Sequence, residues 1–146
     1  MNTTTQPRLP ELMSVLITVA LADLEAAENT PTLKVDMNYW HSPQQGKAIE
    51  LCYVCFAGSV MAQTLGVSDI ENVNPDDFSR WNRSRLQALD CIRYGNLSDA
   101  FNEMFPLEDV PENFPKDRAV AEYGHYPDAF KRDMKQIIAE LESAGF

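Results

Sequence analysis

The first apolar segment of the chain lies between two prolines, Pro10 and Pro31. Pro10 suits the first position of a helix, and Pro31 disfavours helical geometry in the residue before it. We therefore expect a helix over residues 10–28, and because its apolar arc is wide, other elements must cover it. Its apolar residues recur at helical spacing, at Met13, Leu16, Ile17, Ala20, Leu21 and Leu24.

Apolar and polar residues alternate from Leu33 to Trp40, which predicts a short strand or one arm of a hairpin. A polar turn with Pro43 and Gly46 should follow. Together with the preceding helix, this pattern places a minor β element near residues 33–40 of an otherwise helical chain.

The segment over residues 49–65 is the most apolar of the chain, and its start has two interpretations. Ile49, Leu51 and Tyr53 alternate as the return strand of a hairpin would. The length of the run and the small residues Ala57 and Gly58 favour a helix instead. We predict a helix over 49–65, in which the small residues let another helix approach closely.

Three further helices are predicted. One covers residues 75–94, one begins at Asn96 or Ser98, and one begins at Pro127 and ends before Gly145. The fold class is thus mainly α, a compact bundle of about five helices in a single domain over 9–146, with a flexible tail over 1–8. Helices one, two and five should supply most of the core. Its expected centre consists of Leu16, Ala20, Val54, Met61, Leu89, Phe101, Ile137 and Leu141.

The charge of the chain restricts its partners. Twenty-two acidic residues outnumber twelve basic ones, giving a formal net charge of −10. Such a surface repels phosphates, which disfavours direct nucleic-acid binding and an anionic membrane surface. A basic protein surface is the natural electrostatic partner, although acidity also simply aids solubility. The polar start of the chain lacks the features of a signal peptide, so we expect a cytoplasmic protein.

Cys52 and Cys55 form a C-x-x-C pair, and Cys91 is the third cysteine. An odd number of cysteines argues against a disulfide framework. Zinc binding by the three cysteines with His41 is one alternative, and a redox pair is another. The pair lies in an apolar run without a basic neighbour, which favours burial as small apolar residues. We therefore predict no metal and no cofactor.

The two histidines, His41 and His125, lie among aromatic residues, an arrangement that suits either a general base or a half-buried loop. No nucleophile elbow, zinc-protease motif or phosphate-binding glycine loop is present in the sequence. An uncharacterised hydrolase is therefore an alternative to a non-enzymatic protein, which the sequence favours.

An interaction surface is the preferred interpretation of the exposed aromatic and acidic residues. Trp81 fits the core, whereas Trp40 and Tyr126 occur in turns and suit an interface. Arg80, Arg83 and Arg85 form a local basic cluster that we expect to pair with surrounding acids. The candidate interface residues are Trp40, Tyr126, Asp69, Glu71, Asp76, Asp77, Glu108, Asp109 and Glu112.

Trp40 and the segment from Cys52 to Ala62 resemble a W…C-x-V-C-x-A-G-x-V-M-A signature of small uncharacterised bacteriophage and prophage proteins. Residues 86–90, with Arg93 and Gly95, resemble the rest of that pattern. The resemblance covers about residues 38–102 and implies a phage origin without implying an activity. By analogy with small acidic phage proteins, it suggests an inhibitor of a host or antiviral-defence protein in the host cytoplasm, with DNA mimicry and homodimer formation as further possibilities.

Overall fold

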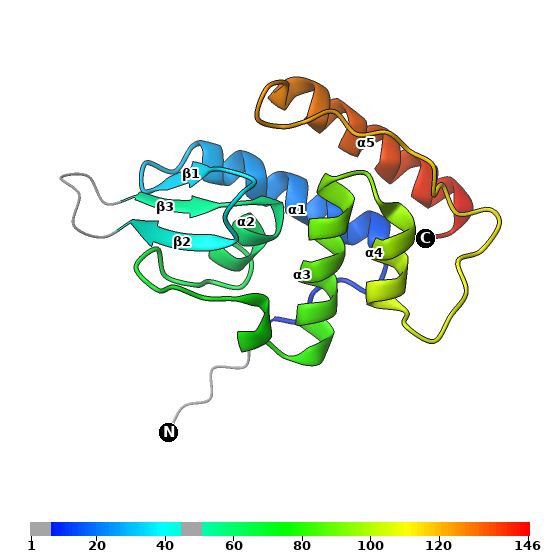
Figure 1. Cartoon of the computed structure of the whole chain (residues 1–146), viewed down its shortest axis with the longest axis horizontal. Helices are drawn as coiled ribbons and strands as arrows, with labels where there is room; N and C mark the ends of the chain where they lie inside the picture. The colour runs from blue at the N-terminus through cyan, green and yellow to red at the C-terminus, as the bar shows by residue number, and fades with distance from the viewer. Residues whose placement is uncertain (1–6, 45–50) are drawn as a thin grey trace.

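The computed structural model describes residues 7–44 and 51–146, and it is mainly helical with a small sheet (Figure 1). The elements in chain order are α1 (Met13–Glu28), β1 (Leu33–Val35), β2 (His41–Gln44), β3 (Leu51–Val54), α2 (Phe56–Ala62), the 3-10 helix η1 (Pro75–Asp77), α3 (Arg80–Arg93), α4 (Leu97–Met104) and α5 (Pro127–Ala144). The predicted fold class is confirmed.

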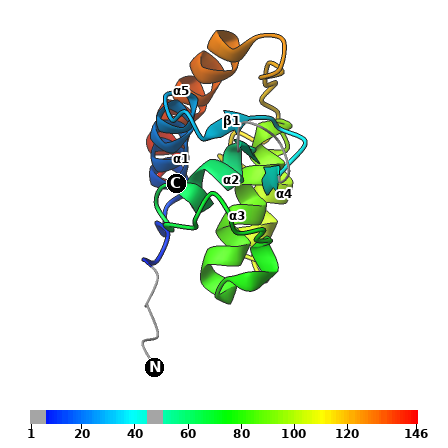
Figure 2. The same ribbon diagram turned by 90° about the vertical axis from the view of Figure 1, so that its left-hand side faces the viewer.

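The α1 helix packs against α5 on one side and against α2 on the other, and α2 in turn contacts α3. Figure 2 shows α1 and α5 side by side, with the antiparallel α3–α4 pair across α2 from them. Within the described chain α1 therefore lies near the middle, which explains its wide apolar arc. All eight residues of the expected core centre are buried, although α3 and α4 line the core as fully as α1, α2 and α5 do.

The prediction of one helix over 49–65 is wrong, because the described part of this segment begins with a strand of the sheet. Leu51–Val54 is a strand that pairs in parallel with β1 and antiparallel with β2, so that β3 is central. Residues 49 and 50 lie outside the described part of the chain. Cys55 has extended backbone and begins a helix of seven residues, α2, whose first six residues are all buried. The apolar run thus comes from two buried elements in series.

The other helix boundaries differ from the predictions in local detail. Helix α1 begins at Met13, because Leu12 and the residues before it are not helical. The predicted helix over 75–94 is divided, since Phe78 and Ser79 are extended between η1 and α3. Residues 41–44 of the predicted polar turn form strand β2 instead, and Gly46 lies outside the described part of the chain.

The start of α4 and the end of α5 follow the sequence signals. The Asn96 side chain accepts a hydrogen bond from the Asp99 amide at the start of α4. Gly145 has the left-handed backbone that ends α5, and the Phe146 amide donates to the Leu141 carbonyl, so the chain end folds back on the core. No helix in the described ranges has both the length and the hydropathy needed to cross a bilayer.

Candidate functional site

The predicted acidic residues lie in two separate loops. Asp69, Glu71, Asp76 and Asp77 belong to the connection between α2 and α3, whereas Glu108, Asp109 and Glu112 belong to the loop after α4. Figure 1 shows the α3–α4 pair between these two loops. The structure therefore does not bring the seven carboxylates into one group.

The two predicted aromatic anchors also lie apart. Trp40 is half-buried and packs against the main core, and its backbone carbonyl accepts from the Cys55 amide. Tyr126 is 65% exposed at the start of α5. Only Tyr126 therefore presents most of its side chain to a partner.

In the part of the chain that the structure describes, most carboxylates have no lysine or arginine partner. Among residues 7–44 and 51–146, ion pairs with lysine or arginine form at three carboxylates: Asp90 with Arg93, Glu140 with Arg118, and Glu28 with Lys131. Of the predicted interface acids, Asp69 accepts from the Thr32 hydroxyl and Asp77 from the Asn74 amide. None of them is held by a cation of the described chain.

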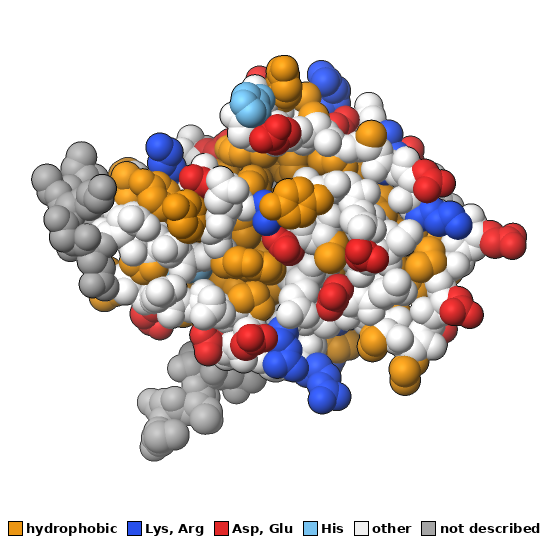
Figure 3. Space-filling model, viewed as in Figure 1, with side chains coloured by type: hydrophobic (Ala, Val, Ile, Leu, Met, Phe, Trp, Pro, Cys, Tyr) orange, Lys and Arg blue, Asp and Glu red, His pale blue; other side chains and the backbone are white. Residues whose placement is uncertain are grey.

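A further acidic group lies on the exposed side of the α3–α4 pair, and the sequence analysis missed it. Asp90, Asp99 and Glu103 are close enough to Cys91 to help raise the pKa of that thiol to about 11, after burial as the main cause. Figure 3 shows acidic side chains over α3 and α4, interspersed with uncharged ones. Asp99 and Glu103 are four residues apart in a predicted helix, and this spacing was the signal that could have identified the group.

The cysteine and histidine residues of the alternative metal site are only partly brought together. The Cys52 sulfur lies 3.6 Å from Nδ1 and 3.7 Å from Nε2 of His41, and both residues are buried. Cys55 instead caps α2, accepting from the Gly58 amide at 3.3 Å, and Cys91 lies on α3. In the described ranges, no three His, Cys, Asp or Glu side chains are grouped so that they could hold a metal ion.

The His41–Cys52 pair is not set up for nucleophilic chemistry. Burial, assisted by Asp69, raises the pKa of Cys52 to about 11, so the thiol stays protonated near neutral pH. Burial also lowers the pKa of His41, against opposing interactions with the Glu71 backbone and the Asp69 carboxylate. A thiol nucleophile needs the thiolate and access to substrate, and this pair offers neither.

The prediction that the arginine cluster at the start of α3 pairs with acids is wrong for the described residues, and Arg85 binds the backbone before α1 instead. Within the described chain, Arg80, Arg83 and Arg85 form no ion pair. The Arg85 guanidinium is buried, donates to the Pro10 carbonyl at 2.8 Å and lies 3.4 Å from the Trp81 ring centroid.

The chain before α1 is fixed to this start of α3. Arg8 lies 3.9 Å from the ring centroid of Trp81, and the indole N–H donates to the Leu9 carbonyl. The Asn82 side chain donates to the Pro7 carbonyl and accepts from the Leu9 amide. Pro7 and Arg8, which the sequence assigned to a flexible tail, are thus held by α3, and the rest of that tail up to residue 6 lies outside the described chain.

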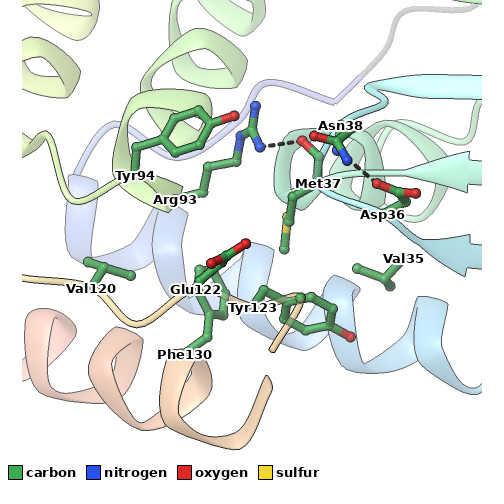
Figure 4. A pocket seen from close by; sticks show the side chains of 11 residues that line it. Val35, Asp36, Met37, Asn38, Arg93, Tyr94, Val120, Glu122, Tyr123 and Phe130 are labelled. Carbon is green, nitrogen blue, oxygen red and sulfur yellow. Dashed lines mark hydrogen bonds between the residues drawn. The ribbon is translucent and has the colours of Figure 1, made fainter. Parts of the chain in front are cut away.

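A pocket of about 530 Å³ opens between the turn after β1, the end of α3 and the start of α5 (Figure 4). Val35, Met37 and Phe130 are among its apolar lining residues. Its charged lining residues are Asp36, Arg93 and Glu122, and the tyrosines are Tyr94 and Tyr123. The volume is in the range of small-ligand sites, roughly 300–1,000 Å³.

The walls of this pocket are fixed by hydrogen bonds. Arg93 donates from Nε to Asp90 at 2.7 Å and from Nη1 to the Met37 carbonyl, which ties α3 to the turn after β1. Tyr123 donates to Glu28, and the Lys131 ammonium contacts the other oxygen of that carboxylate at 2.5 Å. Three distant parts of the chain therefore form a preformed cavity.

The exposed charges at the pocket are acidic. Glu122 is mostly exposed, and its one ion-pair partner in the described chain is the exposed His125. In Figure 4 the Glu122 carboxylate points toward the space between Arg93 and Met37. The pocket can thus offer carboxylates, aromatic rings and an apolar floor to a ligand.

In the comparisons with known proteins, no family model, curated protein or solved structure matches this chain.

Proposed function

We propose that this chain is a non-enzymatic interaction protein whose carboxylates bind a basic surface of another protein. The observation that carries the proposal is the small number of internal ion pairs: with a net charge of −10, three described carboxylates are matched by lysine or arginine. Because of the phage-like signature, we propose as the partner a host or antiviral-defence protein that the chain inhibits in the host cytoplasm.

The carboxylates without an internal partner are the charges that remain for another protein. A carboxylate that is already paired must lose that partner before it can bind another cation, whereas an unpaired carboxylate gains from each new contact. Attraction between opposite surface charges speeds association and selects basic partners, and dissolved salt weakens this attraction. The two acidic loops, with Asp99 and Glu103 of the α3–α4 pair, supply this charge on a rigid helical support.

DNA mimicry is a narrower form of the same proposal and has less support. It requires a continuous series of carboxylates spaced like duplex phosphates. The predicted acids fall in two loops on either side of α3–α4, and the face in Figure 3 intersperses acidic side chains with uncharged ones. We therefore favour recognition of a basic protein surface over imitation of a duplex.

The test is affinity capture from a bacterial lysate at low ionic strength, with matched charge variants as bait. One bait carries Asp69→Asn, Asp76→Asn and Glu71→Gln, and a second carries Asp109→Asn, Glu108→Gln and Glu112→Gln. A third bait removes three acids away from these loops, through Glu11→Gln, Glu25→Gln and Glu142→Gln. Asp77 is left intact because its carboxylate accepts from the Asn74 amide.

A specific basic protein should be retained by the wild-type bait and by the third bait, and lost from the first or the second. The three variants have equal net charge, so this pattern separates a recognition surface from general acidity. Equal capture by all four baits would contradict the proposal, as would the absence of a retained basic protein.

A further inference from the structure

We infer that the pocket between β1, α3 and α5 binds an arginine side chain of the partner protein. This inference rests on the proposed function, and it names the point of the surface at which one partner residue is held.

The cation of the pocket wall is already engaged. Arg93 pairs through Nε with Asp90, donates from Nη1 to the Met37 carbonyl, and has its Cζ 3.9 Å from the Tyr94 ring centroid. Its charge is matched by Asp90, so it presents little net charge to a ligand. A carboxylate or phosphate ligand would have to displace these contacts.

The anions of the wall are not engaged in the same way. Asp36 accepts from the Asn38 amide at 3.0 Å and forms no ion pair with a described residue. Glu122 contacts His125 at 3.2 Å, and both of these side chains are more than two-thirds exposed. Two carboxylates with no lysine or arginine partner in the described ranges therefore favour a cationic ligand.

The remaining lining suits a long cation with an apolar stem. Val35 and Met37 are half-buried and offer apolar surface for methylene groups, and Phe130, which also lines the pocket, is fully buried. The Tyr94 side chain is 68% exposed. A planar guanidinium can stack on an aromatic ring, and it can pair with a carboxylate through two parallel hydrogen bonds. An ammonium group has no planar face and no such pair of parallel donors. These features favour arginine over lysine.

The position of the pocket connects it to the acidic surface. Arg93 ends α3, and its partner Asp90 is one of the three carboxylates around Cys91 on the α3–α4 pair. A peptide that places one arginine in the pocket would therefore continue toward Asp99 and Glu103. About 530 Å³ also leaves room for part of the neighbouring peptide backbone.

The test uses a short blocked peptide with one central arginine and glycine elsewhere, titrated into the isotopically labelled full chain at low ionic strength. The amide signals of Tyr94, Val120 and Gly124 report on the pocket, and those of Glu108 and Glu112 report on a distant acidic loop. The matched ligand replaces arginine by citrulline, which has nearly the same shape without the charge. Agmatine, a small organic cation, forms a third arm.

We expect saturable shifts of the pocket signals with the arginine peptide and none with the citrulline peptide. Glu122→Gln should weaken binding about three- to fivefold, in line with an exposed ion pair, and the double variant with Asp36→Asn should weaken it further. Glu142→Gln, which removes an exposed acid of α5 outside the pocket, should leave the affinity unchanged.

Shifts confined to the loop signals would overturn the inference and leave the proposed function standing, because the acidic surface would then bind without the pocket. Equal binding of the citrulline and arginine peptides would overturn it. So would agmatine, which has the same guanidinium and methylene stem as arginine, if it shifted signals outside the pocket and left the pocket signals unchanged. Unshifted pocket signals in a chain that still captures a basic partner would also reject the pocket alone.

Discussion

The backbone carbonyl oxygen of Trp40 lies 1.4 Å from the position that a Cβ atom on Gly58 would occupy. Helix α2 therefore packs directly on the backbone at the start of β2, and the small residues predicted to admit a second helix admit this turn instead. The same turn supplies the Trp40 carbonyl that accepts from the Cys55 amide.

Gly58→Ala should thus be strongly destabilising, because a methyl group cannot fit without moving the Trp40 backbone. We expect a loss of more than about 3 kcal/mol, above the usual range for overpacking. Chemical denaturation of the variant measures it. Gly66→Asn is the control, since no atom lies within 4 Å of its Cβ position and asparagine tolerates its left-handed backbone; a similar loss in both variants would contradict the close contact.

Arg85→Ala should destabilise the chain by roughly 2–3 kcal/mol, because a charged hydrogen bond to the Pro10 carbonyl and the stacking on Trp81 are lost together. Arg83→Ala, on the same helix and half-exposed, should change the free energy of unfolding by less than about 0.5 kcal/mol. Limited proteolysis of the segment before α1 provides a second measurement: cleavage there should accelerate in Arg85→Ala alone. Equal stability of the two variants would refute the structural role of Arg85.

His41 should make stability depend on pH in a defined direction. Burial lowers the pKa of His41 below its ordinary 6.5, so the unfolded chain takes up a proton at a higher pH than the folded chain does. The free energy of unfolding should therefore fall as the pH decreases through about 6.5, and this contribution should level off below the folded pKa.

Urea titrations at a series of pH values check this expectation. His41→Gln should flatten the slope in that window, whatever its effect on overall stability. An unchanged slope in His41→Gln would show that the burial argument is wrong.

Burial raises the pKa of each of the three thiols to about 11. Because the three pKa values are alike, exposure should decide the order in which the thiols react. Near pH 8, alkylation should be slow and should modify the half-exposed Cys91 first. Cys52 and Cys55 should react only when denaturant unfolds the chain. Mass spectrometry of peptides after timed alkylation shows the order, and rapid native labelling of Cys52 would contradict its burial beside His41.

Local signals explain which parts of the fold were predictable. The end of α5 at Gly145 and the Asn96 cap of α4 depend on a few adjacent residues; the first was predicted, and Asn96 was one of the two predicted starts of α4. The segment after Leu51 was not, because a short apolar strand followed by a short buried helix has no distinct period. The parallel pairing of Leu33 with Cys52, which decides the matter, is a long-range contact.

The candidate site was less predictable than the fold. Its acids could be named from composition, but their division into two loops follows from the packing of α3 and α4 between them. The pocket joins Asp36, Arg93 and Glu122, which are far apart in sequence. Only the folded chain shows that Arg93 pairs with Asp90, and that among the described residues the other two carboxylates have no lysine or arginine partner.

The most direct measurement is the affinity of the chain for its captured partner at increasing salt concentration, determined for wild type and for the two loop variants. If the unpaired acids form the contact, log Kd should rise steeply with log salt, and the slope should decrease in the variant that loses the partner. An affinity that does not change with salt, or one with the same slope in every variant, would show that these carboxylates do not hold the complex together.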